Sequence, residues 1–329
     1  MHIRSRVCRY IIPNLTPILL VAIFFLVAGC GGPRAERDST RADRLGAIQS
    51  GGVERTYRLH LPSSYDGEKP VPLLLAFHGG GGDGAGMERL THLSEIADRH
   101  GFAVVYPDGI DRNWNDGRPE INPGVDDVGF VKDLLAELDG RYAIDESRVY
   151  STGISNGGFF SFRLAFDMPE GIAAIAPVAA LMTEILYSRP APSLPMPVAL
   201  IEGTDDPLVP WDGGGVGFGR GTRGTVVSAS DTISYWVEHD GCTPGPVEKT
   251  LPDADPADGT LVVSEEYGGG RDGSRVILYR VEGGGHTWPG GWQYLRERAI
   301  GRTSRDFDAG EAVWEFCRGH TRATSGGGP

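Results

Sequence analysis

The chain alternates short, continuous apolar runs with longer segments in which apolar residues recur at helical spacing. A run such as VPLLLAF at residues 71–77 is typical of a strand buried on both faces, whereas residues 53–62 alternate as an edge strand does. The strands predicted in this way cover residues 53–62, 71–77, 102–106, 148–152, 172–179, 197–202, 261–267 and 275–281. The predicted helices cover residues 84–99, 125–142, 156–166, 225–239 and 307–318.

Strands that alternate with helices predict one α/β domain, which we place at residues 50–320, with a mostly parallel sheet covered by helices on both faces. In such sheets, ligands bind beyond the carboxyl ends of the strands. A glycine-rich tract, GGGVGFGRGTRG at residues 213–224, lies within this region. We interpret it either as a mobile flap over a cleft or as a loop without function.

The N-terminal segment is typical of an export signal rather than of the fold. Arginines at positions 4, 6 and 9 precede an unbroken apolar stretch at residues 18–28, which is too short for a membrane-spanning helix. The stretch ends in Leu-Val-Ala-Gly-Cys30, which resembles a bacterial lipobox and implies cleavage of residues 1–29 and acylation of Cys30. An ordinary signal peptide or a short uncleaved anchor is the alternative. Residues 30–49 are predicted to be a flexible tether, and residues 321–329 a disordered tail.

Charge and cysteine content restrict the partners. With 31 Lys and Arg against 44 Asp and Glu, the formal net charge is −13, which argues against a nucleic-acid partner. Of the four cysteines, Cys242 and Cys317 would remain after export and acylation. In an oxidising compartment we expect them to form a disulfide between the end of one helix and the last helix; the alternative is two buried free thiols. No zinc-binding spacing occurs, so no metal is predicted.

A candidate nucleophile lies between a predicted strand and a predicted helix. Gly153, Ser155 and Gly157 form a G-x-S-x-G pattern in YSTGISNGGFF. A glycine-rich chain produces such matches by chance, but the order of strand, turn and helix is the one that a nucleophile elbow requires. The strained serine backbone needs small residues two before and two after it, and both glycines supply them.

A serine nucleophile requires a base, and the base requires an acid. Of the histidines that follow Ser155, His239 lies near a helix end and His320 near the tail, whereas His286 follows a strand in the loop EGGGHTW. We therefore predict His286 as the base. The acid is expected in the loop GTDDPLVP after the strand at 197–202, where Asp205 and Asp206 compete.

Two backbone N–H groups are needed to hold an oxyanion. Asn156 follows the candidate nucleophile, and the loop HGGGGD follows the strand at 71–77, with Gly80 as its expected donor. The same loop could instead cradle a phosphate, but it contains no lysine and lacks Walker spacing.

These motifs together resemble those of the polyhydroxybutyrate depolymerase and feruloyl esterase group of secreted α/β-hydrolases. The resemblance covers residues 55–320 and includes LLLAFHGGGG, VDDVGF, YAIDESRVYSTGISNGG, EGTDDPLVPW and GGGHTWPGG. It implies an α/β-hydrolase fold and a triad of Ser155, Asp206 and His286. It also implies hydrolysis of carboxylic esters without a metal or an organic cofactor. One departure is Glu202, which stands where the group usually has histidine; its negative charge is expected to raise the pKa of the base.

The substrate is less defined than the reaction. Trp211, Trp288 and Trp292 lie in the acid and histidine loops and are predicted to bind a phenolic acyl group or a sugar face. No polymer-binding module follows the last helix, which favours soluble or oligomeric esters, of feruloyl, acetyl or hydroxyalkanoate type. The alternatives are a serine peptidase or amidase of the same fold, and a surface binding protein that has lost catalysis.

Overall fold

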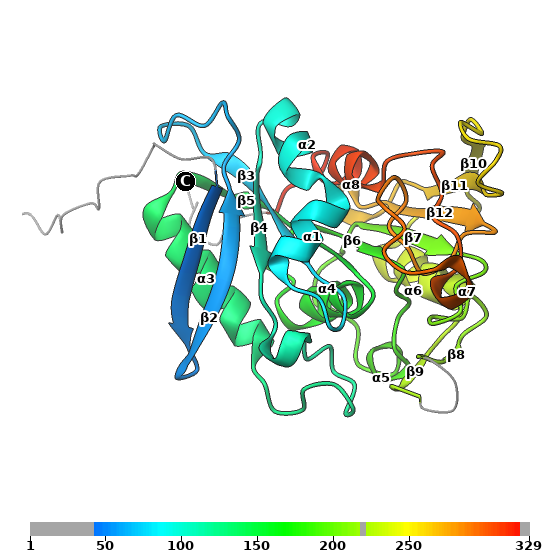
Figure 1. Ribbon diagram of the computed structural model, residues 1–329, viewed down its shortest axis with the longest axis horizontal. Helices are drawn as coiled ribbons and strands as arrows, with labels where there is room; N and C mark the ends of the chain where they lie inside the picture. The colour runs from blue at the N-terminus through cyan, green and yellow to red at the C-terminus, as the bar shows by residue number, and fades with distance from the viewer. Residues whose placement is uncertain (1–42, 218–221, 323–329) are drawn as a thin grey trace, which may run out of the picture. The chain divides into compact units, whose positions relative to one another are not determined.

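The computed structural model describes residues 43–217 and 222–322, all within one compact unit that spans residues 36–329. Its centre is a ten-stranded sheet in the order β1-β2-β4-β3-β5-β6-β7-β12-β11-β10 (Figure 1). The strands of this sheet are β1 (Asp43–Ser50), β2 (Val53–His60), β3 (Val71–Phe77), β4 (Ala103–Pro107), β5 (Ile144–Ile154), β6 (Ala174–Val178), β7 (Val198–Gly203), β10 (Val247–Thr250), β11 (Leu261–Tyr267) and β12 (Val276–Glu282). The α-helices are α1 (Gly84–Thr91), α2 (Leu93–His100), α3 (Asp127–Arg141), α4 (Asn156–Asp167), α5 (Glu184–Tyr187), α6 (Ala229–Asp240), α7 (Glu297–Ile300) and α8 (Ala309–Cys317).

The six central strands, from β4 to β12, run parallel, and antiparallel strands extend the sheet at both ends. Strand β3 is continuously apolar because both of its faces are covered: Leu73 and Leu75 belong to one hydrophobic cluster, and Leu74 to the other. Helices α3, α4 and α6 contribute to the first cluster, and α1, α2 and α8 to the second. This arrangement confirms the predicted α/β architecture.

The predicted tether is wrong at its C-terminal end, because residues 43–50 form strand β1 on the edge of the sheet. Ser50 pairs with Val53 across a two-residue turn of Gly51 and Gly52, which have φ of 58° and 80°. Two glycines at positive φ are typical of a tight hairpin turn. Residues 53–60 therefore form an inner strand rather than the predicted edge strand.

The predicted tail is wrong at its N-terminal end, because Arg322 is bound to the domain. The Arg322 N–H donates to Ser147 O at 2.8 Å, and its guanidinium donates to Ile172 O at 2.9 Å. Residues 323–329 lie outside the described part of the chain, as do residues 1–42 with the predicted signal peptide and Cys30. Within residues 43–217 and 222–322, no helix combines the length and apolar character needed to cross a bilayer.

The glycine-rich tract is closed at its base by two short strands. Strands β8 (Gly214–Gly215) and β9 (Thr225–Val226) pair antiparallel, while residues 218–221 are not described. The helix predicted from residue 225 therefore begins only at Ala229. The Ser228 side chain caps it by accepting from the Asp231 N–H.

The predicted disulfide is wrong: Cys242 and Cys317 are both free and buried. Cys242 follows α6 and belongs to the hydrophobic cluster on one side of the sheet. Cys317 ends α8 and belongs to the cluster on the other side. The sheet thus separates the two thiols, and burial raises the pKa of both.

Candidate active site

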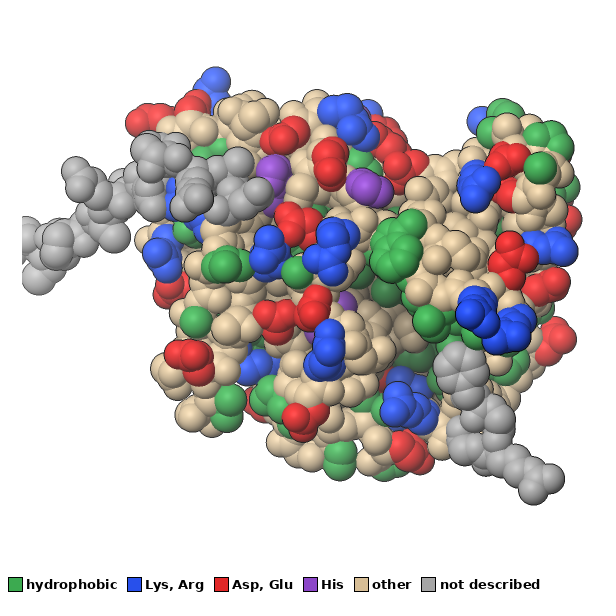
Figure 2. All heavy atoms as spheres, in the orientation of Figure 1, with side chains coloured by type: hydrophobic (Ala, Val, Ile, Leu, Met, Phe, Trp, Pro, Cys, Tyr) green, Lys and Arg blue, Asp and Glu red, His purple; other side chains and the backbone are tan. Residues whose placement is uncertain are grey.

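A cavity of about 730 Å³ opens beyond the carboxyl ends of β3 and β5 and beside the loop after β12. Figure 2 shows hydrophobic side chains gathered beside a hollow in this face of the molecule. Ser155, Asn156, His286 and the glycine loop after β3 all line the cavity. The structure therefore brings together three of the motifs that the sequence singled out.

Ser155 occupies a strained turn between β5 and α4. Its backbone has φ of 54° and ψ of −120°, a region that non-glycine residues seldom adopt. A Cβ on Gly153 would lie 2.6 Å from the carbonyl carbon of Gly157. A Cβ on Gly157 would lie 2.7 Å from His78 O, and nearer still to Phe77 O. Strand, helix and glycine loop are thus packed backbone against backbone, as the G-x-S-x-G pattern predicted.

The structure shows which of the two candidate aspartates contacts His286. Asp206 is buried, and its Oδ2 lies 2.7 Å from His286 Nδ1. Its Oδ1 accepts from the N–H groups of Leu208 and Val209 at 2.7 and 2.8 Å, which fixes the carboxylate. Asp205 is exposed, and among the described residues its side chain accepts only from Thr204 Oγ1, at 3.3 Å.

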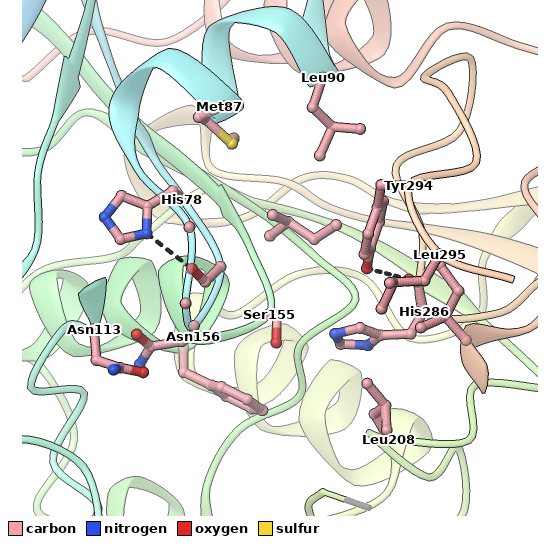
Figure 3. A pocket seen from close by; sticks show the side chains of 18 of the residues that line it. His78, Met87, Leu90, Asn113, Ser155, Asn156, Leu208, His286, Tyr294 and Leu295 are labelled. Atoms are coloured by element: carbon pink, nitrogen blue, oxygen red, sulfur yellow. Dashed lines mark hydrogen bonds between the residues drawn. The ribbon is translucent and has the colours of Figure 1, made fainter. Parts of the chain in front are cut away.

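His286 is held by its own backbone as well as by Asp206. Its N–H donates to Ile300 O at 2.5 Å, and its carbonyl accepts from the Tyr294 hydroxyl at 2.6 Å. Figure 3 shows the imidazole and the Ser155 hydroxyl pointing toward each other. No hydrogen bond joins Ser155 to His286 in this structure; such bonds are often long before substrate is bound.

The other two histidines lie elsewhere. His239 bonds to the Asp240 carboxylate and to Pro192 O, and His320 packs on Phe316. Neither lines the cavity, so only His286 of the three candidates lies near Ser155.

The glycine loop after β3 is fixed by His78. Its Nδ1–H donates to Gly79 O at 2.8 Å, and its Nε2 accepts from the Gly109 N–H at 3.0 Å. Burial lowers the pKa of His78, in agreement with a neutral ring that holds one proton. The N–H groups of Gly80 and Asn156 bond to no acceptor among the described residues, so both remain available to a ligand.

A network that the sequence analysis missed holds Asn156. Asn156 Oδ1 accepts from the Trp114 N–H at 2.7 Å, and its Nδ2 donates to Trp114 O and to Asp116 Oδ2. Asp116 is buried and also binds Arg118. The only sequence signal is the polar run at residues 113–118, which follows β4 at the same edge of the sheet as the other loops.

The effect expected of Glu202 requires its carboxyl to be charged. Glu202 is 1% exposed, and neither of its carboxyl oxygens has a hydrogen-bond partner among the residues of the described ranges. Burial, and secondarily the nearby Asp206 carboxylate, raise the pKa of Glu202 well above its usual range. The shift favours the uncharged form of this carboxyl, against the negative charge that the sequence analysis expected beside His286.

The three tryptophans do not act together. Trp288 is 1% exposed and belongs to a core cluster, which contradicts its predicted substrate contact. Trp211 packs partly buried against the other cluster and does not line the cavity. Trp292 does line it and is 55% exposed. Within the described ranges, no group of three or more His, Cys, Asp or Glu side chains is arranged to hold a metal ion.

Comparisons with known proteins agree with this arrangement. Residues 55–189 match the family described as Esterase PHB depolymerase. "Putative esterase NocK" of Nocardia uniformis subsp. tsuyamanensis is 34% identical over 82% of this chain and 80% of its own length. Feruloyl esterase B of Piromyces equi is 29% identical over 73% of this chain, and the match spans 44% of that relative.

Solved structures extend the likeness to the fold. An acetyl xylan esterase from Aspergillus awamori superposes with a TM-score of 0.51 and 16% identity, over 74% of this chain and 94% of that one. A thermostable esterase gives the same TM-score and identity over 85% of this chain and 64% of that one. The chain therefore belongs to the esterase PHB depolymerase family and is a carboxylic ester hydrolase with an α/β-hydrolase fold.

Proposed function

We propose that the chain is a serine esterase in which Ser155, His286 and Asp206 form the catalytic triad. One observation carries this proposal. The Asp206–His286 pair, joined at 2.7 Å, faces a serine on a strained turn, inside a cavity that two unbonded N–H groups also line. Nucleophile, base, orienting acid and oxyanion donors are the parts that acyl transfer requires.

The reaction proceeds in two steps. Ser155 Oγ attacks the ester carbonyl carbon while His286 Nε2 takes the hydroxyl proton, and the negative charge moves to the carbonyl oxygen. The N–H groups of Gly80 and Asn156 stabilise that oxyanion. Collapse of the intermediate expels the alcohol, which takes the proton from His286, and leaves an acyl-enzyme. Water, activated by His286, then releases the acid and restores Ser155.

Asp206 orients the imidazole ring of His286. Its Oδ2 accepts from His286 Nδ1–H, which leaves Nε2 free to accept the serine proton. Because Leu208 and Val209 donate to the other oxygen, the carboxylate is held in place beside the imidazolium that forms in the reaction.

The cavity lining fits esters with an apolar part. Met87, Leu90, Phe159 and Leu208 line the cavity, and Trp292 lies at its exposed side. This lining supports feruloyl-type or hydroxyalkanoate oligomer esters, and a small acetyl group also fits in about 730 Å³. Relatives named feruloyl esterase agree with the first class.

A fluorophosphonate probe tests the triad. We expect an adduct on Ser155, located by mass spectrometry, and we expect labelling and p-nitrophenyl acetate turnover to be lost in Ser155→Ala and His286→Ala. Ser193→Ala is the matched control, because Ser193 is exposed and lies outside the cavity. Folded wild-type protein without a Ser155 adduct would contradict the proposal. Turnover of a matched anilide as fast as the ester would indicate an amidase instead.

We further propose that export and acylation at Cys30 hold the enzyme on a membrane surface. The support is the sequence Leu-Val-Ala-Gly-Cys30 after an apolar core. Growth of a bacterial host with an alkyne fatty acid should label the full chain but not Cys30→Ser. Equal labelling of both proteins would exclude Cys30 as the acylated residue.

A further inference from the structure

Of the charged side chains that line the cavity, some have an ion-pair partner among the described residues and one does not. Asp83 binds Arg112 at 2.9 Å and also caps α1. Arg118 is buried and binds both oxygens of Asp116. Arg223 also lines the cavity, but no carboxylate or other acceptor among the described residues binds its guanidinium group. The cavity therefore carries one positive charge that the described protein does not neutralise.

The backbone of Arg223 is fixed on both sides. Its N–H donates to Val216 O at 2.7 Å, and its carbonyl accepts from Arg118 Nη1 at 2.6 Å. Gly224, which follows it, has φ of 82°, and a Cβ there would lie 2.7 Å from Arg118 Cδ. Arg118 thus binds the segment just before β9 that carries Arg223, and this anchoring restricts where the guanidinium can lie.

The guanidinium lies beside the proposed oxyanion donors. A Cβ built on Gly80 would lie 3.8 Å from Arg223 Nη1 and also 3.8 Å from Asn156 Cβ. Asn113 Oδ1 lies 3.0 Å from the same Cβ on Gly80, and Glu120 Oε2 lies 3.4 Å from a Cβ on Gly224, yet neither forms a hydrogen bond or ion pair with the Arg223 guanidinium. No carboxylate among the described residues is therefore bound to this cation.

We propose that Arg223 binds a carboxylate that the substrate carries within a few bonds of the scissile ester carbonyl. The substrate class is then anionic esters, such as hemiesters of dicarboxylic acids or esters of hydroxy acids. This inference rests on the proposed function, because it places the ester carbonyl between Gly80, Asn156 and Ser155. A net charge of −13 repels anions from the molecule as a whole, so a local cation is needed to select them. Guanidinium is suited to the task because it binds carboxylates through two parallel hydrogen bonds.

The test uses two substrate pairs that differ only in charge. Ethyl hydrogen succinate against ethyl succinamate places the carboxylate on the acyl side, and O-acetylglycolate against O-acetylglycolamide places it on the alcohol side. We measure kcat/KM by product quantification for wild type, Arg223→Gln and Arg223→Lys. Arg298→Gln is the matched control, because it removes one exposed charge outside the cavity.

We expect wild type to prefer the anionic member of at least one pair. Arg223→Gln should lower kcat/KM for that anionic ester about 10- to 100-fold, which is the usual worth of a charged hydrogen bond, and leave the neutral partner nearly unchanged. Arg223→Lys should keep part of the preference, and Arg298→Gln all of it. Because Arg223 is exposed, added salt should reduce the preference of wild type and not that of Arg223→Gln.

Failure of the proposed role of Arg223 and failure of the proposed esterase function would give different results. An equal loss for anionic and neutral esters in Arg223→Gln, or no loss for either, would overturn the role of Arg223 while leaving the esterase intact. Absence of turnover for every ester, neutral ones included, would overturn the proposed function together with this inference.

Discussion

Replacing Gly157 by alanine tests whether the packing around Ser155 is as tight as the structure indicates. The added Cβ would lie 2.7 Å from His78 O and 2.6 Å from Phe77 C, whereas ordinary van der Waals contact begins at 3.4 Å. These neighbours are backbone atoms of β3 and of the glycine loop, so no side-chain rotation relieves the clash. Phe77 O lies nearer still, so the start of α4 must move away from the loop by about 1 Å.

The displacement has two measurable effects. Overpacking of this kind typically costs about 1–3 kcal/mol of unfolding free energy. The same movement separates the Asn156 N–H from Gly80, and a misplacement of about 1 Å in an active site can lower the rate about 100-fold. We therefore expect Gly157→Ala to remain folded but to lose p-nitrophenyl acetate turnover about 100-fold at saturating substrate. Urea denaturation measures the first effect, and kcat per folded molecule the second.

Gly140→Ala is the matched control. Gly140 lies exposed in α3, its φ is not positive, and an added Cβ meets nothing within 4 Å. Alanine in a helix interior is about 0.5–1 kcal/mol more favourable than glycine, so this variant should be slightly more stable and fully active. A Gly157→Ala protein with wild-type kcat and stability would refute the reasoning about the turn.

Three further predictions concern ionisable groups. Asp206→Asn should lower kcat about 10⁴-fold, as the corresponding change does in serine proteases, whereas Asp205→Asn should have little effect; steady-state kinetics of both variants checks this. Glu202→Gln should preserve activity and leave the acid limb of the kcat/KM–pH profile in place, because burial favours the uncharged form of the native side chain; a shift of that limb to lower pH would show that Glu202 is ionised. Burial lowers the pKa of His320 to about 4 from an ordinary value near 6.5, so the unfolded chain binds its proton first and the unfolding free energy should fall as pH decreases from about 6.5 to about 4. His320→Gln should weaken that dependence in urea titrations, and an unchanged slope would argue against it.

Elements that have a clear pattern of apolar residues or glycines along the chain could be predicted from the sequence. Residues 71–77 and 261–267 form strands with the predicted bounds, and in the first the apolar run reports burial on both faces. The motif around Ser155 could also be recognised, because Gly153 is needed for its close approach to Gly157, four residues away. Features of this kind depend on neighbours a few residues away.

Features that depend on which side of the sheet a residue lies on, or on contacts between distant segments, could not be predicted. Spacing along the chain does not show that Cys242 and Cys317 lie on opposite sides of the sheet, or that Trp288 faces the core. The choice between Asp205 and Asp206 requires the turn geometry after β7. The polar run that contains Asp116 and Arg118 does not show their role, because Asn156 and Arg223, which they hold, are distant in sequence.

The edge strand β1 determines where the protein can be shortened. The Tyr57 ring of β2 lies over Gly46, so close that a Cβ there would overlap it, and β1 supplies the hydrogen-bond partners along one side of β2. A chain that starts at residue 50 would keep every cavity residue and yet expose a row of unpaired N–H and C=O groups on β2. Such an edge recruits a strand from another molecule. Shortened protein of this kind should therefore be active when dilute and associate as its concentration rises, so its activity alone would not show that the domain is whole.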